Sequence, residues 1–285
     1  MFKSFILTLI VFIAFSISEV RAAYWQHLVD PATAQTWIRS GEVRLIDIRH
    51  TKLGFERGHI EGSVSMPLWS WRGPKGRSGQ PPSNTELTRM VQAAGLYLDD
   101  PILIVHSGLN EISFSAAAWV YWVMKSSGFQ KIAILDGGVR AWKQAGGKVT
   151  RTAYNVAPSD TQITFSDAWI ASTSEVAEIS DGSHAGTLLD ARAGEVQEGS
   201  SIQGAMSYAM TKLMGEDTSK ALAPIDILER LKAVEANWEQ ESVIAFCSNG
   251  LQGAATWFMA SEVVGIENVR LYSESLEGWN AVNSQ

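Results

Sequence analysis

The strongest candidate for chemistry in this sequence is Cys247, the single cysteine of the chain. It follows the apolar run 243–246 and opens a loop, residues 247–253, with the sequence Cys-Ser-Asn-Gly-Leu-Gln-Gly, before a helical pattern begins. Gly250 and Gly253 permit backbone conformations that turn successive N–H groups inward, and the start of the helix adds partial positive charge. Such a loop stabilises an anion, so we expect Cys247 to react as a thiolate or to hold a persulfide. A small buried hydrophobic residue at a strand end is the plainer alternative.

Residues 1–22 have the pattern of a secretory signal peptide. Lys3 precedes the apolar run 5–17, and compact residues end at Ala22, after which we place the cleavage site. The run is shorter than the roughly 20 apolar residues that span a bilayer, so an uncleaved anchor is the less favoured alternative. We therefore expect an exported, periplasmic protein with no stable membrane insertion after cleavage. A lone thiol in that oxidising compartment is a liability unless it is buried or useful.

Composition narrows the remaining possibilities. The chain has 285 residues, 46% of them hydrophobic and 19% charged, which suits two globular domains rather than a disordered chain. A formal net charge of -7 without clustered Lys and Arg argues against nucleic acid as a partner. One cysteine and five scattered histidines exclude an intramolecular disulfide and a Cys-rich zinc site, and no metal site is expected.

Four segments of the first half of the chain recur in the second half in the same order. The matching segments are Leu45–Arg49 with Leu188–Arg192, Gly58–Ser63 with Ser200–Ala205, Ile102–Ser107 with Val243–Ser248, and Leu135–Trp142 with Tyr272–Trp279. The first pair ends in Asp-x-Arg in both copies, and we align the third pair with Ser107 opposite Cys247. The conserved order and the slowly drifting offset indicate an internal duplication.

Within each copy, short apolar β-rich runs alternate with helical patterns, as at Phe114–Lys125 and Ala254–Val264. This alternation is typical of α/β domains, each a parallel sheet flanked by helices. We predict domain 1 over residues 23–150, a polar linker over 151–162 and domain 2 over 163–285. The Gly- and Pro-rich segment 69–84 is expected to be a loop, either covering part of the partner domain or remaining at the surface.

In this duplicated setting the chain resembles the tandem-domain rhodaneses, a family of thiosulfate and 3-mercaptopyruvate sulfurtransferases. The resemblance spans residues 23–285 and depends on four features in their order: the Asp-x-Arg strand end, the turn Gly58–Ser63, the segment Asp136–Trp142 and the Cys-x-x-Gly loop at Cys247. It implies two rhodanese-like domains with the active site at their interface. Domain 2 would be catalytic, and domain 1, with Ser107 at the cysteine position, would be non-catalytic.

The resemblance implies a ping-pong sulfur transfer that requires no cofactor. The Cys247 thiolate would take the outer sulfur of a small anionic donor, and the persulfide would then pass to a thiol, cyanide or protein acceptor. The groups expected to bind the donor are Ser248, Asn249, Gly250, Leu251, Gln252, Gly253 and Arg192. Asp190 would support Arg192, although an Asp190–Arg192 ion pair that only fixes the strand end is an equally open interpretation.

Departures from the family pattern leave the donor open. Thiosulfate-preferring relatives commonly carry Arg or Lys in the cysteine loop and mercaptopyruvate-preferring ones a Gly-Ser-Gly version, and this chain has neither. We place thiosulfate slightly ahead because an exported enzyme is better placed to meet it. The segment Ser273–Trp279 also lacks the Gly137-Gly138 pair of the first copy, so a different local backbone is one interpretation.

Other cysteine chemistries fit the sequence less well. A related phosphatase loop needs an arginine six positions after the cysteine, where this chain has Gly253. A cysteine protease needs a histidine base, and His184 of domain 2 lies in a polar, loop-like stretch. The remaining alternative is an exported carrier or binding protein that holds persulfide sulfur or selenium on Cys247 with little turnover.

Overall fold

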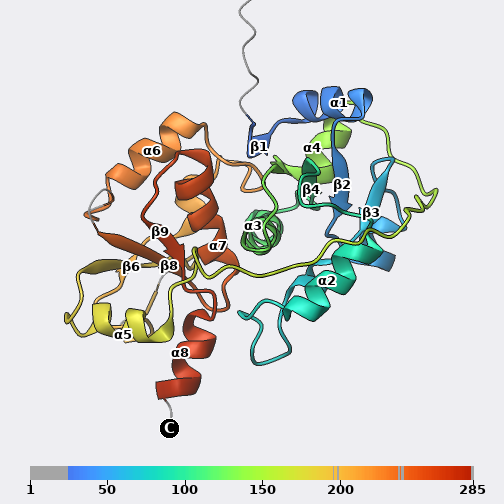
Figure 1. Ribbon diagram of the computed structural model, residues 1–285. Helices are drawn as coiled ribbons and strands as arrows, with labels where there is room; N and C mark the ends of the chain where they lie inside the picture. Colours follow the sequence, from blue (N-terminus) through green and yellow to red (C-terminus); the bar gives the residue numbers. More distant parts are fainter. Residues whose placement is uncertain (1–24, 195, 198, 237, 239–240, 284–285) are drawn as a thin grey trace, which may run out of the picture.

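The computed structural model describes residues 25–283 apart from 195, 198, 237 and 239–240, so the expected signal peptide and its cleavage site lie outside the described residues. Two parallel sheets organise the described chain, one in each half (Figure 1). The first, in the order β1-β5-β4-β2-β3, contains β1 (Leu28–Val29), β2 (Arg44–Asp47), β3 (Ser63–Ser65), β4 (Ile102–Val105) and β5 (Ile132–Leu135). The second, in the order β7-β6-β8-β9, contains β6 (Gly186–Asp190), β7 (Met206–Ser207), β8 (Ser242–Phe246) and β9 (Val269–Leu271).

Helices flank both sheets. In the first half they are α1 (Pro31–Ser40), α2 (Asn84–Ala93), α3 (Glu111–Ser126) and α4 (Gly138–Gln144), with a π-helical turn η1 (Thr51–Phe55) and a 3₁₀ turn η2 (Leu68–Trp71). In the second half they are α5 (Thr173–Ser180), α6 (Pro224–Lys232), α7 (Leu251–Trp257) and α8 (Ser275–Asn283), with a 3₁₀ turn η3 (Met210–Leu213) and a π-helical segment η4 (Phe258–Val263). The α/β fold class is confirmed, and no described helix is long and apolar enough to cross a membrane.

The strand sequences explain why both sheets lie inside. All four residues of β4 are buried, as are the last four residues of β8. A parallel sheet covered on both faces needs continuous apolar runs rather than alternating polar and apolar residues. The central strands β4 and β8 are therefore buried inside each half, and this fixes the positions of the residues that follow them.

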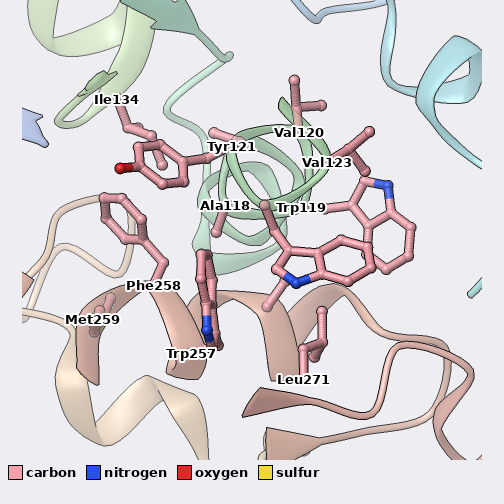
Figure 2. Close-up of a cluster of buried hydrophobic side chains, with 14 of the residues drawn as sticks. Ala118, Trp119, Val120, Tyr121, Val123, Ile134, Trp257, Phe258, Met259 and Leu271 are labelled. Atoms are coloured by element: carbon pink, nitrogen blue, oxygen red, sulfur yellow. The ribbon is translucent and has the colours of Figure 1, made fainter. Parts of the chain in front are cut away.

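Helices α3 and α7 join the two halves through one apolar core. Figure 2 shows Tyr121 of α3 facing Phe258 of η4, and Trp257 of α7 pointing toward α3; all three side chains are almost fully buried. Tyr121 and Phe258 meet edge to face with their ring centroids 4.8 Å apart. The sequence predicted a helix over 254–264, and the structure begins it at Leu251 and winds its second part as η4.

Polar contacts add to this apolar interface. The Lys125 ammonium lies 2.6 Å from the Glu262 carboxylate, and the Tyr121 hydroxyl donates to the same carboxylate at 2.7 Å. Farther along the chain, residues 151–167 contain no helix or strand and are held against domain 1. There the Ser159 and Thr161 hydroxyls both donate to the carbonyl of Leu96. The two domains thus form a single packed body.

The sheet register corrects the alignment of the two copies by one residue. Asp47 pairs with Val105 across β2 and β4, whereas Asp190 pairs with Phe246 across β6 and β8. Consequently His106, and not Ser107 as expected, occupies the position of Cys247. Backbone bonds agree, because the carbonyls of His106 and Cys247 each accept an N–H from the helix that follows the next strand. In the same register Ser107 is the counterpart of Ser248.

Candidate active site

Cys247 lies at the carboxyl end of β8, where a central strand of a parallel sheet points its terminal residue toward a helix start. The residue is 1% exposed. Its N–H donates to the hydroxyl oxygen of Ser275 at 3.0 Å, and the N–H of Gly250 donates to Cys247 Sγ at 3.2 Å. One backbone donor of the expected anion cradle is therefore aimed directly at the sulfur.

Gly250 is required where it stands. It caps α7 with a φ of +94°, a left-handed conformation that side chains other than glycine rarely adopt. A Cβ atom there would lie 2.6 Å from the carbonyl oxygen of Ser273 and 2.6 Å from the ring of Trp119. Any larger residue would push the loop away from α3 and withdraw the N–H that meets the sulfur.

Ser275 was not singled out by the sequence, yet it supports the cysteine directly. Its hydroxyl accepts the Cys247 N–H and donates to the carbonyl of Tyr272 at 3.0 Å. Its φ of +53° makes it the one non-glycine residue with positive φ among those that the structure describes. Gly138, at the same position in domain 1, has a φ of +56°, so the local backbone is retained although the Gly-Gly pair is not. Strain of this kind collects at functional sites.

The remaining predicted loop residues frame the cysteine. Ser248 and Asn249 are exposed, Leu251 and Gln252 are half-buried, and Gly253 is buried. Because α7 begins at Leu251, the N–H groups of its first turn have no acceptor inside the helix. These donors and the helix dipole favour negative charge beside Cys247.

Asp190 and Arg192 form a bidentate ion pair at the end of β6. Arg192 Nε lies 2.9 Å and Nη2 2.6 Å from the two carboxylate oxygens of Asp190, and Nη2 also donates to the carbonyl of Ser200. The hydrogen bond with Asp190 raises the pKa of Arg192 above its ordinary value. Asp47 and Arg49 repeat this arrangement with the same two distances in domain 1. The repetition supports a role in fixing the strand end, and donor binding by Arg192 stays a prediction.

Arg72 brings a cation to the site from the other domain. It follows η2, and its Nη2 donates to the carbonyl of Asn249 at 2.6 Å while the guanidinium lies 4.5 Å from the centre of the Trp119 ring. Its Nη1 is buried without a hydrogen-bond partner among the described residues. Burial lowers the pKa of Arg72 to about 10, against the opposing pull of Cys247 and Glu277, so the group remains charged at neutral pH.

One feature of the sequence indicated that domain 1 reaches the site of domain 2. This feature is the long Gly- and Pro-rich segment after Trp69. Its tip rests on the residues that follow β9. The Ser78 hydroxyl donates to Glu277 at 2.6 Å, and the Gln80 amide donates to Glu274 at 2.7 Å. The segment therefore covers part of domain 2. No cluster of three or more metal-ligating His, Cys, Asp or Glu side chains occurs in the described part of the chain.

Comparison with known proteins agrees with this architecture. The model of the rhodanese-like domain matches the chain twice, over residues 30–145 and 172–282. The chain belongs to the rhodanese-like family. This rhodanese-like protein is 30% identical over 231 residues to a probable 3-mercaptopyruvate sulfurtransferase of Pseudomonas aeruginosa, covering 77% of the chain and 78% of that relative. It is 24% identical over 276 residues to a putative thiosulfate sulfurtransferase of Synechococcus elongatus, covering 90% and 83%.

Solved structures show the same fold at lower identity. The crystal structure of SseA from Escherichia coli, a 3-mercaptopyruvate sulfotransferase, matches with a TM-score of 0.74 and 17% identity over 88% of this chain and 98% of that one. EanB in complex with ergothioneine matches with a TM-score of 0.74 and 16% identity over 90% of this chain and 68% of that one. The rhodanese-like fold of both halves is thereby established.

Proposed function

We propose that this protein is a sulfurtransferase that carries sulfur on Cys247. The observation that supports this most directly is the N–H of Gly250 aimed at Cys247 Sγ, in a loop where negative charge is favoured. A thiolate or the terminal sulfur of a persulfide is the kind of anion that such a loop stabilises. The family membership supports the same reaction class.

The first half-reaction breaks a sulfur bond in the donor. The Cys247 thiolate attacks the outer sulfur of thiosulfate, a new S–S bond forms, and sulfite leaves with the electron pair of the broken S–S bond. With 3-mercaptopyruvate the C–S bond breaks instead, and pyruvate leaves as its enolate and takes up a proton. In the second half-reaction an acceptor thiolate or cyanide attacks the outer sulfur and regenerates the Cys247 thiolate.

Thiosulfate is the favoured donor in this proposal. Its two negative charges need a cation, and the loop 247–253 contains no Arg or Lys. Arg72 supplies that charge from domain 1, close enough to hydrogen-bond the Asn249 carbonyl. We assign Arg72 to donor binding together with the loop residues, with its unpartnered Nη1 as the available donor group.

The test is the intact mass of the purified protein and of its Cys247→Ser variant after exposure to each donor, followed by a cyanide or thiol chase. The expected result is a gain of one sulfur atom by the wild type, removed by the chase, and no gain by the variant. The donor that loads faster identifies the substrate class. Loading of neither donor, or equal loading of the variant, would overturn the proposal.

A sulfur or selenium carrier is the second candidate, because Cys247 is only 1% exposed and the segment from domain 1 rests on neighbouring residues. A persulfide there would be shielded from small acceptors. The chase distinguishes the two: rapid removal by cyanide supports an enzyme, and a persulfide that survives small thiols supports a carrier. Export is part of either proposal, and the N-terminal sequence of protein recovered from a periplasmic fraction would test cleavage after Ala22.

A further inference from the structure

Domain 1 contains an open cleft of about 1020 Å³ that is lined by His106 and Ser107, among other residues. These two residues occupy the positions that Cys247 and Ser248 have in domain 2. All of its lining residues fall between Ile48 and Gln144, so domain 1 alone forms it. Arg72 stands in its wall and reaches the Cys247 loop on the other side. The cleft is thus the domain 1 counterpart of the proposed active site, and Arg72 is the residue that the two have in common.

Large apolar side chains line this cleft although they are open to solvent. Leu53, Trp69, Leu109 and Ile112 are 64%, 67%, 70% and 44% exposed, and all four line it. They are four of the nine exposed large hydrophobic residues in the described chain. Single exposed apolar residues need no explanation, but a group gathered around a concavity marks a binding surface.

The charged side chains of the cleft are all cationic. Arg49, Arg72, Arg140 and Lys143 line it, and none of the lining residues, all within the described chain, is Asp or Glu. Arg49 is neutralised by Asp47, and Arg140 lies 3.4 Å from the exposed Asp217, whereas Lys143 is exposed at the rim. In a chain with a net charge of -7, this local excess of positive charge favours an anionic occupant.

The chemistry at the base of the cleft favours binding without reaction. His106 Nε2 donates to the carbonyl of Leu135 at 3.0 Å, and Nδ1 accepts the N–H of Gly108 at 3.3 Å, which fixes a neutral ring. Burial lowers the pKa of His106 to about 4. With both nitrogens engaged, the residue at the cysteine position offers neither a nucleophile nor a metal ligand.

We propose that the domain 1 cleft binds a small amphipathic organic anion, a carboxylate or sulfonate attached to an apolar body. The apolar body would lie against Leu109 and Trp69, and the acidic group would meet Lys143 and Arg140. The volume suits a small organic molecule, since ligand pockets of this class measure roughly 300–1,000 Å³. This inference is independent of the sulfur transfer proposed for Cys247.

The test is calorimetric titration of the full chain with monomeric dodecanoate at neutral pH, with dodecanol as an uncharged probe of the same length. The pocket variants Leu109→Gln and Lys143→Gln change exposed side chains and leave the sulfur site intact. Matched controls are Ile225→Gln and Lys131→Gln, which alter exposed residues outside the cleft. Sulfur loading of Cys247 is measured on every variant in parallel.

We expect saturable binding at one site, weakened at least about fivefold by each pocket variant and less than about twofold by either control. Dodecanol should bind more weakly than dodecanoate, and sulfur loading should be unchanged throughout. The proposal is overturned if dodecanoate does not bind, or if the controls weaken binding as much as the pocket variants. It is also overturned if the protein binds only vesicles of anionic phospholipid or a protein partner through this cleft.

Discussion

Arg72 Nη2 lies 2.6 Å from the carbonyl oxygen of Asn249, so a guanidinium of domain 1 is held against the loop of domain 2 that carries Cys247. The charge reaches the loop from a residue 177 positions before Asn249 in the chain. Both domains therefore contribute residues to the surroundings of the Cys247 loop. This relationship explains how a loop without Arg or Lys could still bind an anionic donor.

Replacing Arg72 tests that relationship. We expect Arg72→Met to lower kcat/KM for thiosulfate by about 10- to 100-fold, because a partly buried cation facing the donor is lost. Arg72→Lys should recover only part of the loss, since one ammonium cannot hold the Asn249 carbonyl and the donor with the same geometry. Steady-state kinetics with thiosulfate and cyanide provide the measurement.

The matched control is Arg77→Met, which removes an exposed arginine from the same segment. It should leave kcat/KM within about twofold of the wild type. An equal loss in both variants would mean that general positive charge near the site matters and Arg72 has no specific role. Full activity of Arg72→Met would remove Arg72 from the site.

Ser275 offers a test that separates strain from hydrogen bonding. Ser275→Ala keeps the positive φ and leaves the buried Cys247 N–H without its acceptor, which should cost about 1–3 kcal/mol in unfolding free energy. Ser275→Gly loses the same acceptor but relieves the backbone strain, so it should be more stable than the alanine variant by about 1 kcal/mol. Urea denaturation gives both values.

Both Ser275 variants should also transfer sulfur more slowly than the wild type, because the cysteine backbone loses the contact that fixes it. Rates of persulfide formation, followed by mass, would show this. A glycine variant with wild-type rates would mean that the loop holds Cys247 without the serine hydroxyl. An alanine variant as stable as the wild type would argue against the hydrogen bond itself.

Arg192 either binds the donor or only fixes the end of β6, and variants of the two strand-end ion pairs distinguish these interpretations. Because the Asp190–Arg192 and Asp47–Arg49 pairs have the same geometry, we expect Arg192→Met and Arg49→Met to lower the unfolding free energy by similar amounts, about 3 kcal/mol. Each leaves a buried carboxylate without its partner. If both pairs only fix the strand ends, the KM for thiosulfate is unchanged in both variants, measured at a temperature where both are folded. A rise in KM confined to Arg192→Met would assign Arg192 to donor binding.

The sequence predicted those parts of the site whose residues are close together in the chain, and it missed those that depend on contacts between distant segments. The Cys247 loop could be predicted from the sequence because an apolar strand, two glycines and a helix start are adjacent in the chain. The contribution of Arg72 could not be predicted, because its contact with the Cys247 loop depends on how a long irregular segment crosses to the other domain. The one-residue error at His106 has a different cause, since matching Ser107 with Cys247 satisfied the offset while the strand hydrogen bonds set another register. Ser275 was missed because serine gives no signal of positive φ.

The contact between Asp136 and domain 2 should make stability depend on pH. Asp136 lies at the end of β5, and its carboxylate accepts the N–H of Ala221 at 3.2 Å. Burial raises the pKa of Asp136 to about 6, against the opposing effects of the Ala221 hydrogen bond and the nearby Lys220. Between about pH 4 and pH 6 the folded protein therefore holds a proton that the unfolded chain has lost, and the stability contributed by this group falls as pH rises.

Asp136→Asn removes this dependence while retaining an oxygen that can accept the Ala221 N–H. The unfolding free energy of the variant minus that of the wild type should increase by about 2 kcal/mol from pH 4.5 to pH 7 and stay level above pH 7. Urea denaturation across this range provides the measurement. The control is Asp217→Asn, where hydrogen bonds with Ser219 lower the pKa of an exposed carboxylate, so its difference should not increase with pH. A flat profile for Asp136→Asn, or a rise of the same size for Asp217→Asn, would contradict a raised pKa at the domain contact.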